Sequence, residues 1–334
     1  MSLVPSPTIP PEQARVSEPV ADQVARAAVL RRLELEVVRR LDGRVSGEHH
    51  TTAIGPGSER AGAREYTPGD DARRIDWSLT ARSHAAHVRT TEADRELETW
   101  VVADRSASLD FGTAAREKRD VVLGVCAAFG VLTVREGNRY GVLVSGGPEL
   151  VRRPPAAGRR AMLAALATVH DVAREGGAPG PGADLADALR MLPRLSPRRG
   201  QVVVVSDFLD APTAPGAARP RWPEALRALA TRQQVIAVHV SDPREAELPD
   251  VGMLSVVDPE TGRLLHVQTR SKALRERYAA AAAERLARVE RDVQRSGAEY
   301  LHVSTGRDWL ADVVAFAAGR RARHRADALG RVLS

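Results

Sequence analysis

The chain has 334 residues, of which 43% are hydrophobic and 28% charged, so it is long enough and apolar enough to bury a core of its own. Its one cysteine, Cys126, lies in an apolar run, which excludes a disulfide within the chain and predicts a small buried side chain. The net charge of +6 does not indicate nucleic-acid binding, because arginines alternate with acids and only 4% of residues are aromatic.

The N-terminal residues 1–20 are Pro-rich, lack periodicity and are expected to be disordered. They also lack the basic start and apolar centre of a signal peptide. No apolar run approaches the roughly 20 residues that cross a bilayer. We therefore expect a cytoplasmic protein without a membrane span. Residues 21–43 carry apolar side chains at helical spacing and predict a helix, and residues 326–334 predict a basic tail.

Residues 44–98 are the least regular part of the chain and predict a small β-rich lobe of short strands and turns. The lobe contains the stretch EYTPGDDARRIDW, residues 65–77. Its Pro-Gly pair suits the two middle positions of a type II turn. Asp70 or Asp71 is then expected to cap a short helical turn through ARRIDW.

From residue 99 onward, short apolar runs alternate with helical patterns. The expected strands lie at 99–106, 139–147, near 149–155, and at 201–208, 233–242 and 299–305. The expected helices lie at 114–136, 157–170, 184–194, 222–231, 271–297 and 307–323. This alternation predicts an α/β fold, a doubly wound and mostly parallel sheet over residues 99–325, beside the small β-rich second lobe. Two further β runs around the turn DPETG predict an inserted hairpin at 252–269, which we expect to pair with the lobe 44–98.

Acidic residues follow two of the buried strands. Asp104, Ser106 and Ser108 close the first strand, and Asp207 closes the run VVVVS. Ligands of open α/β sheets bind beyond the carboxyl ends of the strands, and magnesium prefers carboxylate and hydroxyl oxygens. The pattern therefore predicts a metal site, with one alternative left open. In that alternative the serines satisfy loop backbone groups and the aspartates cap helices.

The sheet pattern with Asp104, Ser106 and Ser108 resembles a von Willebrand factor type A domain and its metal ion-dependent adhesion site. A more specific similarity is to the bacterial domain-of-unknown-function family 58. It is carried, in the family's order, by the phrases REYTPGDDARRIDW, DRSASLDFG, VVVVSDFLD and VSDPREAELPDVGML. The resemblance spans about residues 40–310.

This resemblance implies a protein-binding adaptor with no enzymatic reaction. Members of the family are typically found beside MoxR-type ATPases of the AAA class, so it implies such an ATPase as partner in the assembly or remodelling of other proteins. It also implies a magnesium ion that accepts a carboxylate of a partner. The adhesion site usually adds a threonine ligand, but Ala183 stands at the matching position and cannot ligate, so magnesium is expected to be held weakly.

The charged residues of 65–77 allow two interpretations. They are Glu65, Asp70, Asp71, Arg73, Arg74 and Asp76, followed by Trp77. We interpret them as an inter-lobe clasp, because arginine–carboxylate pairs are geometrically demanding and an apolar Trp77 can anchor them. The alternative is a metal-dependent hydrolase that uses Asp104, Asp207 and these acids. Against it, the stretch contains no histidine and nothing resembling an activated nucleophile.

Overall fold

The computed structural model describes residues 20–45, 63–68, 71–83, 85–89, 97–112, 116–172, 183–209, 220–257 and 264–333. The chain divides into two compact units, one made of residues 1–41 and 98–334, the other of residues 42–97. The segment 1–19 and the turn DPETG, for which we made predictions, lie outside the described residues.

Six strands of the larger unit form one sheet, in the order β10-β7-β6-β3-β4-β5. They are β3 (Glu98–Asp104), β4 (Arg139–Ser145), β5 (Val151–Ala156), β6 (Gln201–Ser206), β7 (Gln234–Ser241) and β10 (Glu299–Ser304). All neighbours run parallel except β5, which runs antiparallel to β4 at one edge. In the sheet, β4 lies on one side of β3 and β6 lies on the other side, so the strand order reverses at β3. The predicted α/β fold with a doubly wound, mostly parallel sheet is confirmed.

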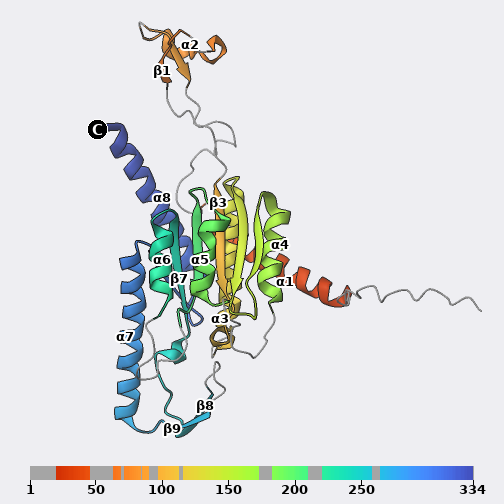
Figure 1. The fold of residues 1–334 in the computed structure, drawn as a ribbon, viewed down its shortest axis with the longest axis vertical. Helices are drawn as coiled ribbons and strands as arrows, with labels where there is room; N and C mark the ends of the chain where they lie inside the picture. The colour runs from red at the N-terminus through yellow and green to blue at the C-terminus, as the bar shows by residue number, and fades with distance from the viewer. Residues whose placement is uncertain are drawn as a thin grey trace, which may run out of the picture. The chain divides into compact units, whose positions relative to one another are not determined.

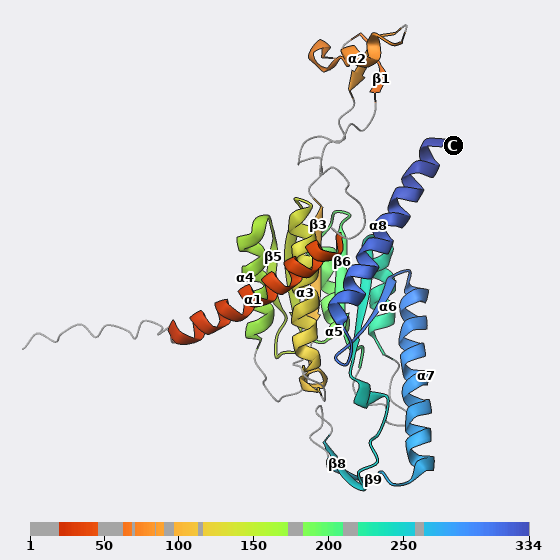
Figure 2. The same cartoon turned by 180° about the vertical axis from the view of Figure 1, so that it is seen from behind.

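Helices cover both faces of this sheet (Figures 1 and 2). One face carries α1 (Val20–Val45), α3 (Lys118–Arg135), α4 (Gly158–Asp171) and α8 (Trp309–Leu333), and the other carries α5 (Leu185–Leu195), α6 (Trp222–Ala230) and α7 (Lys272–Ser296). Side chains alternate along each strand, so Val101 and Ala103 enter the first core while Trp100 and Val102 enter the second. Both faces are therefore buried, as the continuous apolar runs of the strands predict.

The N-terminal helix α1 belongs to the larger unit. Its residues Leu30, Val37 and Leu41 are buried in the same core as α3 and α4. Arg159 of α4 donates from Nε to Glu34 Oε1 at 2.5 Å and from Nη2 to Glu34 Oε2 at 2.7 Å. This two-pronged contact fixes how α1 crosses the helices beneath it.

The inserted hairpin forms, as β8 (Met253–Val257) and β9 (Leu264–Gln268). β8 and β9 pair with each other in an antiparallel two-stranded sheet, and pairing of this hairpin with the lobe 44–98 stays a prediction. Thr269 closes the base of the hairpin, because its N and Oγ1 both donate to Gly252 O, at 2.6 and 2.9 Å. The two strands thus form their backbone hydrogen bonds with each other, within the hairpin.

The smaller unit contains one two-stranded antiparallel sheet, β1 (Ala63–Glu65) with β2 (His87–Arg89). A 3₁₀ turn, η1 (Ala72–Arg74), and a one-turn helix, α2 (Trp77–Thr80), lie between these strands. An isolated bridge joins Ile75 to Val88, which is buried.

Candidate functional site

Five polar residues converge where the carboxyl ends of β3 and β6 meet. We call Asp104, Ser106, Ser108, Ser206 and Asp207 the strand-end cluster. The two strands are hydrogen-bonded neighbours, and the strand order reverses between them, which is where ligands of open α/β sheets bind. Ser206 Oγ donates to Asp104 Oδ2 at 2.5 Å, and both aspartates are almost wholly buried. All four residues predicted as metal ligands therefore lie together.

The loop after β3 is folded by its own side chains. Asp104 Oδ1 accepts a hydrogen bond from Ser106 N at 2.9 Å, and the next residues form the 3₁₀ turn η2 (Ala107–Asp110). The hydroxyls of Ser106 and Ser108 lie 3.1 Å apart, and Ser108 also hydrogen-bonds the carboxylate of Asp207. Asp104 thus shapes the turn that follows its own strand, but it is not the helix cap that the alternative to metal binding expected, because Ser106 stands at the N-cap of η2.

Ala183 lies beside the strand-end cluster, and its methyl side chain is buried. Its carbonyl oxygen accepts from Gly146 N, at the end of β4, at 2.9 Å. Next to it, Asp184 caps α5 by accepting from Asp187 N at 2.8 Å. The position of the usual threonine ligand therefore offers no side-chain oxygen, and the neighbouring carboxylate is committed to a helix end.

Sequence reasoning missed Lys118, which enters the strand-end cluster from the first turn of α3. Its Nζ donates to Asp207 Oδ2 at 2.7 Å and to Glu245 Oε1 at 2.5 Å, and its side chain has no exposed surface. Glu245 ends the 3₁₀ turn η3 (Pro243–Glu245), which follows β7. Lys118 is one of two lysines in an arginine-rich chain and begins an apolar helix, which was the available signal.

The buried charges shift one another's proton affinity. Burial and, second, the charge of Asp207 raise the pKa of Asp104 to about 6. Burial would also raise the pKa of Asp207, but the charge and hydrogen bond of Lys118, together with hydrogen bonds from Ser108 and Leu209 N, hold that pKa below its ordinary value. Burial likewise opposes the charge of Lys118, yet Asp207 and Glu245 keep its pKa above the usual value. The ammonium–carboxylate pair is thus charged at neutral pH.

These contacts fit a divalent metal ion poorly. Both oxygens of Asp104 accept hydrogen bonds, from Ser106 N and Ser206 Oγ. Asp207 accepts from Lys118 at one oxygen and from Leu209 N, at 3.1 Å, at the other. Within the described ranges, no group of three or more His, Cys, Asp or Glu residues is arranged to hold a metal ion. Magnesium at this place stays a prediction.

His239 of β7 is a buried neutral histidine behind the strand-end cluster. Its Nδ1 lies 2.9 Å from Tyr300 Oη, and its ring packs edge-on against Phe208 at 5.8 Å between centroids. Burial, and then the nearby His302, lowers the pKa of His239 from 6.5 to about 3. The folded protein therefore excludes a proton that the unfolded chain binds below pH 6.5.

This histidine predicts a stability loss in acid. The native pKa is below the unfolded one, so the free energy of unfolding contributed by neutral His239 is intact above pH 6.5 and falls as the pH drops toward 3. The full loss is of the order of 5 kcal/mol. Urea denaturation at several pH values should show a flatter acid limb for His239→Asn, which keeps an acceptor for Tyr300 but cannot titrate. Parallel pH profiles of variant and wild type would contradict this assignment.

The acids of residues 65–77 act locally in the smaller unit. Asp71 caps η1 by accepting from Arg73 N at 3.0 Å, as predicted, and Asp76 caps α2 by accepting from Ser78 N at 3.1 Å. Glu65 is exposed in β1, and Asp70 lies outside the described residues. Trp77 does not serve as a buried anchor within this unit, because it is 69% exposed. A clasp between the units stays a prediction.

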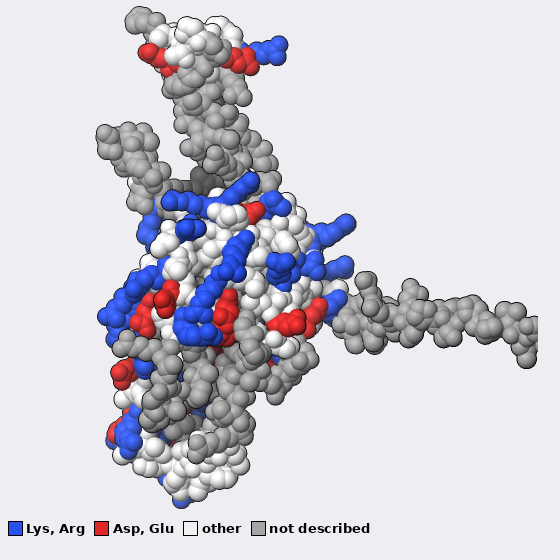
Figure 3. All heavy atoms as spheres, in the orientation of Figure 1, with Lys and Arg blue, Asp and Glu red and all other residues white. Residues whose placement is uncertain are grey.

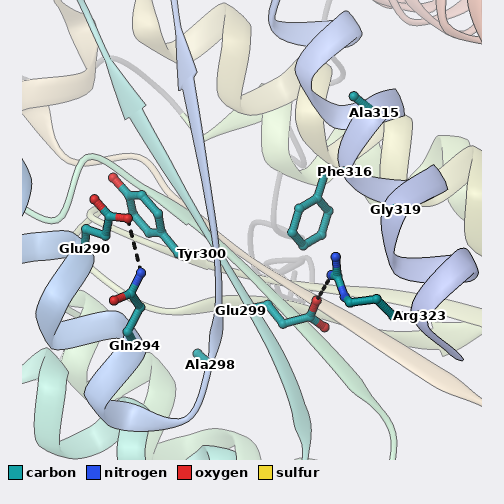
Figure 4. Close-up of a pocket in the computed structure, with 9 residues that line it drawn as sticks. All are labelled: Glu290, Gln294, Ala298, Glu299, Tyr300, Ala315, Phe316, Gly319 and Arg323. Atoms are coloured by element: carbon teal, nitrogen blue, oxygen red, sulfur yellow. Dashed lines mark hydrogen bonds and ion pairs between the residues drawn. The ribbon is translucent and has the colours of Figure 1, made fainter. Parts of the chain in front are cut away.

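Another hollow lies at the opposite end of the sheet, between α7 and α8 (Figure 4). It has a volume of about 410 Å³ and is bordered by Glu299 at the start of β10. Glu299 pairs with Arg323 at 3.0 Å and with Arg320 at 2.8 Å, and Gln294 donates to Glu290 at 3.1 Å. These polar groups at the hollow bind one another, so we do not take the hollow as the functional site.

The basic residues of the larger unit are interspersed with acids on the face shown in Figure 3. Arg190 pairs with Asp187 at 3.0 Å on α5, and Arg221 also binds Asp187, at 3.3 Å. That face therefore does not present a surface of one charge. Along the described residues, no helix is both long and apolar enough to cross a bilayer.

Comparison with known proteins gives a family and close relatives. The model of a family described as "Protein of unknown function DUF58" matches residues 62–288. The uncharacterized protein Rv1480 of Mycobacterium tuberculosis is 44% identical over 323 residues, which are 96% of this chain and 96% of that protein. An uncharacterized protein of Mycobacterium avium is 39% identical over 173 residues, covering 52% of this chain and 95% of its own length.

Solved structures give weaker likenesses. The conserved hypothetical protein BatB from Bacteroides thetaiotaomicron aligns with a TM-score of 0.41 and 14% identity, over 67% of this chain and 98% of its own. A von Willebrand factor type A protein from Catenulispora acidiphila aligns with a TM-score of 0.33 and 16% identity, over 47% of this chain and 35% of its own. Because these TM-scores are low, the fold assignment rests on the strand order of this chain.

Proposed function

The chain belongs to the protein family of unknown function DUF58, and from this premise we propose that it is a protein-binding adaptor that catalyses no reaction. Its binding surface is the carboxyl end of the sheet around the strand-end cluster. The partner is an AAA ATPase of the MoxR type, which the resemblance of the sequence motifs implies. The joint task is the assembly or remodelling of other proteins.

The hydrogen bonds that the carboxylates of Asp104 and Asp207 accept support a binding role over a catalytic one. A general base needs an oxygen that can take a proton from substrate or water, and a hydrolase with two metals needs several free oxygens. In the strand-end cluster, all four oxygens of Asp104 and Asp207 already accept hydrogen bonds from the protein. Both carboxylates are also almost wholly buried, so a substrate or metal ions would have to enter this network, and we favour the adaptor.

The surface around the strand-end cluster supports a contact role. Phe111 directly follows η2 and is 39% exposed, although its ring lies 5.9 Å from the buried Nζ of Lys118. A shallow hollow of about 550 Å³ opens after β4, lined in part by Gly147, Val151 and Val172. Exposed apolar groups beside a rigid polar core are typical of surfaces that bind a protein partner.

Removing the Phe111 ring should weaken capture of the ATPase. We expect the Phe111→Ala variant of the full chain to bind a MoxR-type ATPase of the same organism at least about tenfold more weakly than the wild type, because exposed aromatic rings dominate binding energy. Quantitative copurification in the presence of ATP measures the effect. The matched control is Leu35→Ala on α1, which removes a side chain that is 52% exposed on a helix covering the sheet.

Three results would contradict the proposal. Equal capture by Phe111→Ala and the wild type would place the contact elsewhere on the molecule. Failure of the wild type to capture the ATPase at all would remove this partner. Turnover of a phosphoester or peptide substrate that disappears in Asp104→Asn would favour the hydrolase instead.

A further inference from the structure

The ammonium group of Lys118 is the cation of the strand-end cluster. Lysine is almost never wholly buried unless it is paired, and here both partners are carboxylates, Asp207 at 2.7 Å and Glu245 at 2.5 Å. The side chain reaches the cluster from the first turn of α3, a helix that is itself mostly buried. Its position is thus fixed by the core as well as by charge.

The oxygens that a metal ion would need are already occupied. Magnesium requires about six oxygen ligands at about 2.0–2.1 Å in near-octahedral geometry. An ion bound to Asp207 would share that carboxylate with the ammonium and be repelled by it at short range. The hydroxyl of Ser206 is turned to Asp104, and its oxygen accepts from Phe208 N at 2.9 Å. Each carboxylate oxygen of Asp104 and Asp207 thus already accepts a hydrogen bond from the protein.

We infer that Lys118 is a built-in cation that takes the place of a divalent metal ion in the strand-end cluster. The residues therefore do not fit the magnesium site that the sequence resemblance implies. Because the ammonium is covalently part of α3, the arrangement of the cluster is independent of metal concentration. It also ties three segments together, since Lys118, Asp207 and Glu245 follow different strands of the sheet.

The inference changes the expected chemistry of the partner, and this step rests on the proposed function. A metal ion with an open position can accept a carboxylate from a partner, but the ammonium of Lys118 has no exposed surface. A partner carboxylate cannot reach it without displacing Asp207 or Glu245. The partner is then recognised through apolar and neutral groups around Phe111.

Metal titration of the full chain tests the inference directly. We expect no saturable binding of Mn²⁺ or Mg²⁺ to the wild type by calorimetry or by the Mn²⁺ electron paramagnetic resonance signal. Lys118→Ala removes the ammonium and opens space among Asp207, Glu245 and Ser108. We expect this variant to bind one Mn²⁺ per chain, and the additional change Asp207→Asn to abolish that binding.

Each outcome of the titration decides whether Lys118 takes the place of a metal ion. Saturable binding to the wild type that Asp207→Asn removes would overturn the inference. Absence of binding to both the wild type and Lys118→Ala would also overturn it, because the ammonium would not be what excludes the ion. If Lys118→Ala does not fold, Lys118→Ser serves as the second variant, since it keeps the space and adds a hydroxyl ligand.

Capture of the ATPase separates this inference from the proposed function. To keep the nucleotide's own magnesium out of the comparison, capture is measured without nucleotide, with and without a chelator. We expect the chelator to leave capture unchanged, whereas a metal-bridged contact would be lost. If the wild type captures nothing even with ATP present, the proposed function fails, while the metal titration, which needs no partner, still tests the role of Lys118.

Discussion

Replacing Lys118 with methionine should lower the free energy of unfolding by about 3–5 kcal/mol, which is the range for breaking a buried ion pair from one side. The variant keeps most of the side-chain volume but leaves Asp207 buried without its ammonium, beside Asp104 and Glu245. Equilibrium denaturation in urea at neutral pH measures the loss.

The chain provides a matched control in its other lysine. Lys272 is 82% exposed, and its Nζ lies 3.6 Å from Glu276 one turn further along α7. Lys272→Met should therefore change stability by no more than about 0.5 kcal/mol. Combining Lys118→Met with Asp207→Asn should recover part of the loss, because the uncompensated charge is then removed. Equal stability of the two methionine variants would show that the buried ammonium contributes nothing.

Substituting Gly146 with alanine should cost more than about 3 kcal/mol and also abolish capture of the partner. Gly146 has φ of +90°, and a Cβ there would lie 2.2 Å from Ser106 N and 2.5 Å from Arg105 C. These atoms are backbone, so the loop that carries the strand-end cluster must move. Chemical denaturation measures the loss of stability, and the capture assay measures the loss of partner binding.

Gly137 is the control that separates backbone strain from collision. It has φ of +75° after α3, but a Cβ there would meet no atom within 4 Å. Gly137→Ala should therefore cost only about 1–2 kcal/mol, the strain of a left-handed residue with a side chain, and leave capture unchanged. Similar losses in the two variants would mean that the loop after β3 yields easily to the added methyl group.

The strand-end cluster could be predicted because its parts follow from local patterns. Asp104 and Asp207 each end a run of buried apolar residues, and an alternating α/β chain places such ends at one edge of the sheet. Asp71 could be foreseen as a cap because it stands just before a short helical turn. These inferences use only neighbours along the chain and the handedness of α/β connections.

The contacts of Lys118 could not be predicted in the same way. Its two carboxylates lie 89 and 127 residues further along the chain, and no period in the sequence links them. The partner of the hairpin could not be predicted for a related reason. Alternation of apolar residues identifies a strand such as β8 but does not name its partner. Trp77 is exposed within its unit because burial depends on packing, not on apolar character alone.

The crossing of α1 over α3 and α4 bears on where the chain can be cut. A fragment limited to residues 62–288, which the family model matches, would lack α1, β10 and α8. It would also end inside α7. Apolar groups that α1 and α8 now cover would face water, and the outer edge of β7 would lose its neighbour. Such a fragment would aggregate during overproduction in a host cell, because an uncovered strand edge offers unpaired N–H and C=O groups to a second copy.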